Sequence, residues 1–388
     1  MPENSLSEIK VTQAAKKVNL LGLSQGNLEQ FLADRGEKPF RAKQLMQWIY
    51  QRDVDDFELM TDLSKSLRAR LMEDAEILCP EVQARHDAKD GCVKWLFRSG
   101  FGQAVETVFI PEANRGTLCI SSQVGCALDC SFCATGAQGF NRNLTSAEIL
   151  GQVRHAIREL PRRENGEPAI SNVVLMGMGE PLANYRNVVP VLELLVSDFA
   201  YGMSRRRVTV STSGIVPHID KLSQDCNVAL AVSLHAPTDG LRDEIVPINK
   251  LHPIKTLLDA CWRYAANHSN RFITFEYVML RGVNDSLEQA NQLASLLKNK
   301  PAKVNLIPFN PFPGTEFKRS SADTIRHFQD RLRQRGLVAT TRKTRGDDID
   351  AACGQLAGKV SSRIKKPLGQ KQVSVKIGEI KDMRMSSV

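Results

Sequence analysis

The sequence lacks any run of 18 or more apolar residues, the length that a membrane-spanning helix needs. Its first 17 residues contain no apolar segment of the kind found in secretory signal peptides. Internal repeats and low-complexity blocks are also missing. These absences argue against a membrane protein, a secreted protein and a repeat protein, so we expect a cytoplasmic chain with no membrane partner.

The sequence also lacks the cysteine pattern of a small disulfide-rich protein, which is an even number of cysteines in a short chain. There are nine cysteines in 388 residues, and an odd number in a long chain argues against a secreted disulfide framework. The hydrophobic share of 42% and the charged share of 24% are ordinary for a globular protein. The length exceeds that of one compact core and suits an α/β barrel with an added domain.

The formal net charge is +9, and much of it is concentrated near the end of the sequence. Residues 359–388 hold eight Lys or Arg and two acids, which gives +6 of the total. Such a basic segment suits a phosphate backbone, as does the exposed-looking run Arg205-Arg206-Arg207. A solvated surface explains either segment equally well.

From residue 117 onward, strand-like and helix-like stretches alternate six times. The expected strands are 117–122, 171–177, 207–211, 228–234, 272–279 and 303–308. The expected helices lie near 146–160, 187–198, 217–224, 253–266, 286–299 and 321–335. Six units predict an α/β fold with an incomplete (β/α)6 barrel, because a closed barrel of this kind has eight. Ligands of such a barrel bind at the carboxyl ends of the strands.

The stretches before the barrel have a different pattern. Residues 20–80 show apolar residues at helical spacing, and 90–115 predict antiparallel strands. We therefore expect four parts: a helical RNA-binding accessory domain (1–90), a β extension (91–116), the barrel (117–345), and a C-terminal loop with the basic tail (346–388).

Three cysteines follow the first barrel strand in the pattern C-x3-C-x2-C: Cys126, Cys130 and Cys133. Three thiolates bind a soft metal centre, and no fourth Cys or His lies close by in sequence. A structural zinc site would need a further ligand from a distant part of the chain. An iron–sulfur cluster with one iron left open for a substrate or cofactor fits the pattern better.

This arrangement resembles the radical S-adenosylmethionine (SAM) superfamily. The resemblance implies that the three thiolates hold a [4Fe–4S] cluster whose fourth iron binds SAM. The segment Gly177-Met178-Gly179-Glu180-Pro181, at the end of the second strand, resembles the glycine–glutamate turn of that superfamily. There, glycine lets the backbone approach a ligand, and Glu180 accepts from the SAM ammonium group.

Over nearly its whole length the chain resembles the RlmN family of adenosine-C2 RNA methyltransferases, whose close relative Cfr methylates C8. The matching motifs are Ser121–Cys126, Gly177–Pro181, Ser211–Gly214, Ser233–Ala236, Asn310–Pro311 and Ala352–Leu356. On these motifs the resemblance implies SAM contacts at Gly179, Glu180, Ser211, Ser233, Leu234, His235 and Asn310.

The resemblance also assigns a role to two further cysteines and one acid. It implies that Cys353 takes a methyl group from one SAM and, with radical chemistry from a second SAM, bonds to C2 of adenine. Glu106 then acts as the base, and Cys119 releases the product through a transient disulfide with Cys353.

The implied RNA partners are 23S rRNA and tRNA with an adenosine beside the anticodon. The implied protein partner is a flavodoxin-like or ferredoxin-like electron donor, and we expect the enzyme to be a monomer. Two alternatives stay open: a C8 methyltransferase, and a zinc-stabilised RNA-binding protein without catalysis.

Overall fold

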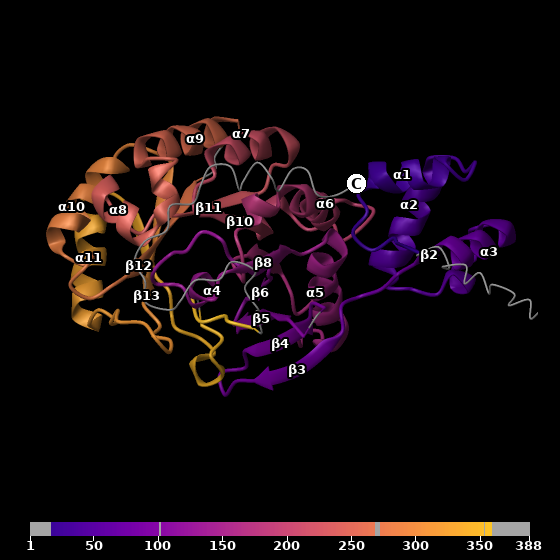
Figure 1. Ribbon diagram of the computed structural model, residues 1–388, viewed down its shortest axis with the longest axis horizontal. Helices are drawn as coiled ribbons and strands as arrows, with labels where there is room; N and C mark the ends of the chain where they lie inside the picture. The colour runs from indigo at the N-terminus through magenta and orange to yellow at the C-terminus, as the bar shows by residue number, and fades with distance from the viewer. Residues whose placement is uncertain (1–16, 101, 268–271, 353, 359–388) are drawn as a thin grey trace, which may run out of the picture.

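The computed structural model describes residues 17–100, 102–267, 272–352 and 354–358. The chain forms a small helical part near its start and a large part in which helices surround a curved sheet (Figure 1). The proposed carbon carrier Cys353 and the basic stretch 359–388 lie outside the described residues. No helix of the described ranges is both long and apolar enough to cross a membrane.

The helical part contains three α-helices and a short two-stranded ladder. Its elements are β1 (Val18–Asn19), α1 (Gln25–Ala33), α2 (Phe40–Met46), η1 (Gln47–Gln51), η2 (Phe57–Leu59), α3 (Lys65–Asp74) and β2 (Ala75–Glu76). Ser24 and Ser64 cap α1 and α3, because each hydroxyl accepts a backbone N–H three residues further on. Leu28, Leu45 and Ile49 are fully buried, as the helical spacing of apolar residues predicts.

Ion pairs and rings attach the helical part to helix α5 (Ser146–Glu159) and to the segment after α6 (Tyr185–Val196). Asp53 accepts from Arg154 at 2.7 Å and from Arg158 at 2.6 Å. The rings of Tyr50 and Tyr201 lie 5.4 Å apart. The two parts therefore share one continuous hydrophobic core.

One sheet of ten strands runs through the large part, in the order β14-β13-β12-β11-β10-β9-β6-β5-β4-β3. Its parallel strands are β6 (Arg115–Cys119), β9 (Asn172–Leu175), β10 (Val208–Thr212), β11 (Ala229–Ser233), β12 (Ile273–Met279), β13 (Ala302–Pro308) and β14 (Val338–Thr341). The six predicted strands are thus confirmed, and β14 is an addition. Since β14 and β3 both stay at edges, the barrel is open, and the expected incomplete barrel is confirmed.

The β extension continues this sheet with antiparallel pairing. Its strands are β3 (Val82–Asp87), β4 (Val93–Arg98) and β5 (Ala104–Glu112), and β5 pairs with β6. Strand β3 falls inside the predicted 1–90 segment yet pairs with β4 in the main sheet. The domain boundaries given above remain predictions.

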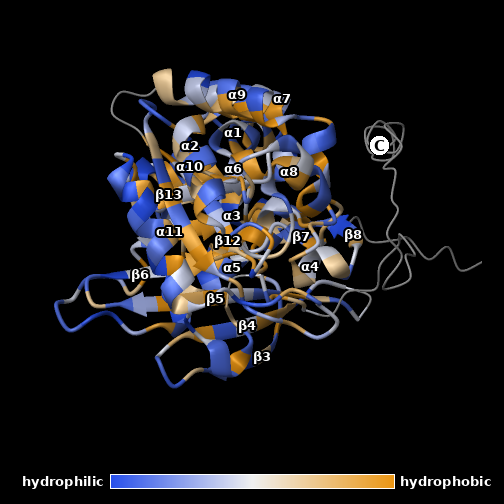
Figure 2. Cartoon of the chain, turned by 90° about the vertical axis from the view of Figure 1, so that its left-hand side faces the viewer, coloured by the Kyte–Doolittle hydropathy of each residue, from blue (hydrophilic) through white to orange (hydrophobic). Residues whose placement is uncertain are grey.

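Helices cover the outer face of the parallel strands, and Figure 2 shows polar and apolar residues interspersed along their ribbons. They are α5, α6, α7 (Val216–Asp225), α9 (Ile254–Ala266), α10 (Leu287–Leu296) and α11 (Ala322–Gln334), which confirms the six predicted helices. Capping boxes at Thr145 and Ser286 begin α5 and α10. Shorter elements line the strand ends: β7 (Gln123–Gly125), α4 (Ala134–Ala137), β8 (Phe140–Asn143), η3 (Pro181–Asn184), η4 (Arg205–Arg207), α8 (Asp239–Ile245), η5 (Pro247–Lys250) and η6 (Asp347–Ile349).

Candidate functional site

A cavity of about 150 Å³ opens at the carboxyl ends of the barrel strands, where the parallel sheet predicts ligand binding. It is lined from the cysteine loop, from the ends of β9 to β13, and from the C-terminal segment through Gly354 and Leu356. Of the residues predicted from sequence, Cys126, Cys130, Cys133, Gly179, Glu180, Ser211, Ser233 and His235 line this cavity.

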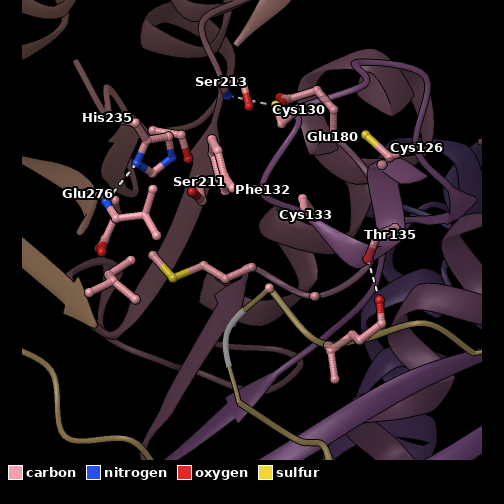
Figure 3. Close-up of a pocket in the computed structure, with 18 of the residues that line it drawn as sticks. Cys126, Cys130, Phe132, Cys133, Thr135, Glu180, Ser211, Ser213, His235 and Glu276 are labelled. Atoms are coloured by element: carbon pink, nitrogen blue, oxygen red, sulfur yellow. Dashed lines mark hydrogen bonds between the residues drawn. The ribbon is translucent and has the colours of Figure 1, made fainter. Parts of the chain in front are cut away.

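The cysteine loop connects the β7 strand to α4 and presents its three thiols to one side of the cavity (Figure 3). The Cys126 backbone N–H donates to the Gly139 carbonyl at 2.8 Å, and the Cys133 N–H donates to the Cys130 carbonyl at 3.1 Å. Asp129 takes the left-handed conformation with φ 56°, which turns the loop back on itself. These local bonds bring the three cysteine side chains of residues 126–133 onto one wall of the cavity.

The surroundings of the three cysteine thiols disfavour their negatively charged thiolate form unless a cation lies beside them. Burial raises the pKa of the Cys126 thiol well above its usual range, and the Cys130 thiol beside it raises it further. Burial, with the neighbouring Cys133 thiol, raises the pKa of Cys130 to about 12. Several thiolates in this place therefore need positive charge beside them, which bound iron supplies.

The donor set fits an iron–sulfur cluster. Three thiolates are the ligands that iron–sulfur clusters take, with each cysteine bound to a different iron atom. Within the described ranges, no three His, Cys, Asp or Glu side chains converge closely enough for a single metal ion. A cluster spreads its ligands over several iron atoms, so this spacing and the donor set agree with it.

The turn after β9 fixes Glu180 beside the cysteine loop. Its two carboxylate oxygens accept the backbone N–H groups of Leu182 at 3.0 Å and Ser213 at 2.8 Å. Burial raises the pKa of Glu180 to about 7, against the lowering effect of these hydrogen bonds. The carboxylate is therefore poised to accept a bound ammonium group, which would restore its charged form.

Gly179 makes that turn possible. It has φ 96°, and a Cβ at this position would lie 2.5 Å from the Gln123 Cβ. Gln123 in turn accepts the Glu180 backbone N–H at 2.8 Å. The sequence motif therefore needs glycine here for both conformation and space.

His235 follows β11 and reaches the cavity in a left-handed conformation with φ 61°. Its Nδ1 accepts the Val278 backbone N–H at 3.0 Å (Figure 3). Burial, with help from Arg242, lowers the pKa of His235 to about 3. The imidazole is therefore neutral, and its other ring nitrogen, Nε2, is the one that carries a hydrogen.

Two of the predicted SAM contacts do not reach the cavity lining. Leu234 is fully buried, and its backbone N–H donates to the Glu276 carbonyl at 3.1 Å. Asn310 accepts from Arg319 through its Oδ1 at 2.6 Å. Their role in binding SAM stays a prediction.

Arg242 on α8 is a site residue that the sequence motifs did not reveal. It is fully buried, and its guanidinium donates to the carbonyls of Leu234, Ser213 and Ser233 at 3.0, 2.7 and 3.0 Å. It therefore ties together the chain after β10 and after β11, which both line the cavity. No pattern around it in sequence distinguishes it from a surface arginine.

Glu276 and Arg342 line the cavity, and the sequence motifs did not reveal them either. Both Glu276 oxygens accept from Asn305, at 3.2 and 2.9 Å. Burial raises the pKa of Glu276, and the nearby Arg342 opposes that rise. In the sequence, Glu276 could have been recognised as a site residue because it is the one acid in the otherwise mostly apolar strand β12.

Cys119 and Glu106 lie outside the cavity lining but share one face of the sheet. Cys119 pairs with Val108 across β6 and β5, and Glu106 is two residues from Val108, so their side chains point to the same side. Thr107, on the other face, donates to Gln152 of α5. Glu106 is buried, contrary to what is usual for a strand carboxylate.

Chain segments on both sides of Cys353 cover that same face, beside β5 and α4 (Figure 1). The Gly354 carbonyl accepts the Ala134 N–H at 2.9 Å, and the Leu356 carbonyl accepts the Thr135 hydroxyl at 2.5 Å. The Ala357 N–H donates to Glu106 Oε2 at 3.1 Å. The segment therefore forms part of the cavity wall and contacts the proposed base.

Comparisons with known proteins agree with this geometry. Residues 18–77 match the family model "Ribosomal RNA large subunit methyltransferase N-terminal domain", and residues 120–294 match the model of the radical SAM superfamily. A solved structure described as a radical SAM methyltransferase from Sphaerobacter thermophilus is 45% identical, with a TM-score of 0.80. The match covers 87% of this chain and 99% of that one.

Two more distant solved structures share less with the chain. SuiB from Streptococcus suis is 14% identical with a TM-score of 0.43, over 58% of this chain and 48% of that one. A domain of pyruvate-formate lyase-activating enzyme from Bacteroides vulgatus is 18% identical with a TM-score of 0.36, over 45% and 99%.

Proposed function

This chain belongs to the RlmN family of radical SAM methyltransferases, and from that premise we propose that it forms 2-methyladenosine in 23S rRNA and in tRNA. The matches to radical SAM methyltransferases exclude the alternative of a zinc-stabilised RNA-binding protein without catalysis. The observation that supports the finer proposal most is that Cys119 and Glu106 share the sheet face covered by the segment around Cys353.

Cys126, Cys130 and Cys133 would hold the [4Fe–4S] cluster, and Glu180 would accept from the SAM ammonium group. When bound, the reduced cluster supplies the electron that cleaves SAM to methionine and a carbon radical. Ser211 and Ser233 line the same cavity and offer hydroxyl groups to the rest of SAM.

Cys353 carries the carbon in this proposal. Its thiolate takes the methyl group of a first SAM and leaves S-adenosylhomocysteine. Loss of one hydrogen atom from that methyl to the radical derived from a second SAM leaves a carbon radical on the Cys353 sulfur. This radical adds to C2 of adenine, which is too electron-poor to attack SAM itself.

Glu106 and Cys119 complete the reaction. The adduct gives up one electron to the oxidised form of the flavodoxin-like or ferredoxin-like protein, and Glu106 takes the proton from C2. The Cys119 thiolate then attacks the Cys353 sulfur, so that a disulfide forms, the sulfur–carbon bond breaks and its electron pair takes a proton to give the methyl group. An external dithiol restores both thiols, and a flavodoxin-like or ferredoxin-like protein supplies the single electrons.

Nucleoside mass spectrometry with unmodified rRNA and tRNA fragments tests the proposal. The anaerobically reconstituted enzyme, with reductant and SAM, is expected to give 2-methyladenosine from both RNAs. Formation of 8-methyladenosine instead would assign the enzyme to C8 chemistry.

Variants of the two cysteines test the mechanism. Cys119→Ala is expected to accumulate a covalent protein–RNA species, and Cys353→Ala to form no product and no adduct. Cys79→Ala, at a half-buried thiol elsewhere, serves as the matched control and should turn over normally. Normal turnover by Cys119→Ala would contradict its release role.

A further inference from the structure

Lys94 and Glu106 form an ion pair on the sheet face that the C-terminal segment covers. Lys94 lies opposite Val108, and Leu96 lies opposite Glu106, so the pair is diagonal across β4 and β5. Lys94 Nζ is 3.3 Å from Glu106 Oε1, and the two side chains are only 10% and 11% exposed. The pair is therefore enclosed by the chain that runs over it.

Each member of the pair also binds the backbone of that chain. Lys94 Nζ donates to the Asp350 carbonyl at 3.3 Å. Glu106 Oε2 accepts the Ala357 N–H at 3.1 Å. Because Asp350 and Ala357 stand before and after Cys353, the single ion pair holds both flanks of the segment that carries this cysteine.

A second pair of contacts attaches the start of this segment to the turn before β4. The Gly346 N–H donates to Asp90 Oδ2 at 3.1 Å, and the Lys89 N–H donates to Asp348 Oδ2 at 3.1 Å. These bonds fix where the segment begins, whereas the Lys94–Glu106 pair fixes the stretch around Cys353. The β extension thus supplies the surface on which the segment is placed.

The same contacts occupy the carboxylate that the proposed reaction uses as a base. One Glu106 oxygen faces Lys94, and the other accepts from Ala357. A carboxylate oxygen has two lone pairs, so each Glu106 oxygen can keep its contact with the docked segment and still present a lone pair to the RNA base. Docking of the segment and the proposed proton acceptance therefore depend on the same carboxylate.

We propose that Lys94 is a positioning residue, which together with Glu106 docks the chain on both sides of Cys353 onto the β extension. The inference rests on the proposed function for the roles of Cys353 and Glu106. The docking itself is a property of the protein without RNA. Stability alone gives little reason for such a pair, because a buried ion pair gains little over apolar residues.

Hydrogen–deuterium exchange of the full-length protein tests the docking. In Lys94→Gln, amide exchange within 346–358 is expected to become about tenfold faster, the effect of losing one charge-assisted hydrogen bond. Lys94→Arg, which retains the charge, should restore most of the protection. Lys255→Gln removes an exposed ion pair with Asp259 on α9 and is the matched control, with no change in this segment.

Turnover of the reconstituted enzyme provides a second readout. Lys94→Gln leaves every cavity residue intact, so SAM cleavage should continue while methyl transfer to RNA falls about tenfold, and Lys94→Arg should recover the coupling. A purely structural role would reduce both rates together. Should Lys94→Gln fail to fold, Glu106→Gln removes the same charge pair while keeping an oxygen for the Ala357 N–H, and its exchange is measured instead.

The outcomes separate the two proposals. Unchanged exchange in the folded Lys94→Gln protein, or an equal change in Lys255→Gln, would overturn the docking role. Faster exchange in Lys94→Gln together with absence of any methylated nucleoside from wild-type enzyme would retain the docking and refute the proposed function.

Discussion

The carboxylate of Glu180 accepts the backbone N–H of Ser213 at 2.8 Å, and so joins the turn after β9 to the chain after β10. The same carboxylate accepts the Leu182 N–H within its own turn. A side chain that we propose to bind SAM thus also connects two strand ends. Binding and local structure at this site are therefore linked, and changes near Glu180 affect both.

Removal of one thiol should abolish the cluster. Cys130→Ala, reconstituted without oxygen, is expected to bind at least tenfold less iron and sulfide than wild type and to cleave no SAM. Cys79→Ala should bind iron normally. Iron and sulfide analysis decides, and full iron content in Cys130→Ala would exclude this residue as a ligand.

Gly179→Ala should lose SAM binding because the added Cβ would meet Gln123 at 2.5 Å in a left-handed turn. Gly166 also has positive φ, 78°, but its Cβ would meet nothing within 4 Å. Gly166→Ala is thus a control for strain alone, worth about 1 kcal/mol. Calorimetric titration with SAM should show at least a tenfold weaker affinity for Gly179→Ala only.

His235 should make the apoprotein sensitive to mild acid. Its pKa is about 3 in the folded protein and about 6.5 when unfolded, so the unfolded state binds a proton first as the pH falls. The stability it contributes is complete above pH 6.5 and is lost as the pH approaches 3. Between pH 7.5 and pH 5 this amounts to about 2 kcal/mol in the free energy of unfolding.

His235→Asn is the variant that isolates this effect. Asn tolerates the left-handed conformation, and its Oδ1 can accept the Val278 N–H in place of Nδ1. Urea unfolding measures the free energy of unfolding at pH 7.5 and at pH 5. The difference of about 2 kcal/mol between the two pH values should largely disappear in His235→Asn. An unchanged difference would show that other groups cause the acid sensitivity.

Arg242→Met should destabilise the fold by about 3 kcal/mol or more, because it removes every hydrogen bond of a fully buried guanidinium. SAM affinity should fall with it, since the chain after β10 and β11 loses its common anchor. Arg263→Met breaks an exposed pair with Asp220 and should change neither property. Thermal unfolding and SAM titration measure the two effects.

Much of the architecture could be predicted because local pattern and final structure agree. Strands such as β12 are apolar runs of β-branched and aromatic residues, and the helices between them have clear caps and apolar stripes. Strand β14 was missed because Val338–Thr341 is short and alternates exposed and buried residues at an edge. Strand β3 was missed for a similar reason, since none of its residues is fully buried.

The sequence by itself determined the family, the strand–helix alternation and the cysteine loop, because spacing within a few residues is enough to specify each of them. Only the tertiary structure decided that Arg242 anchors the cavity wall, and that Lys94 and Glu106 hold residues more than 250 positions away. Those contacts join elements from different parts of the chain. They depend on strand register and on which face each side chain takes, which no local pattern encodes.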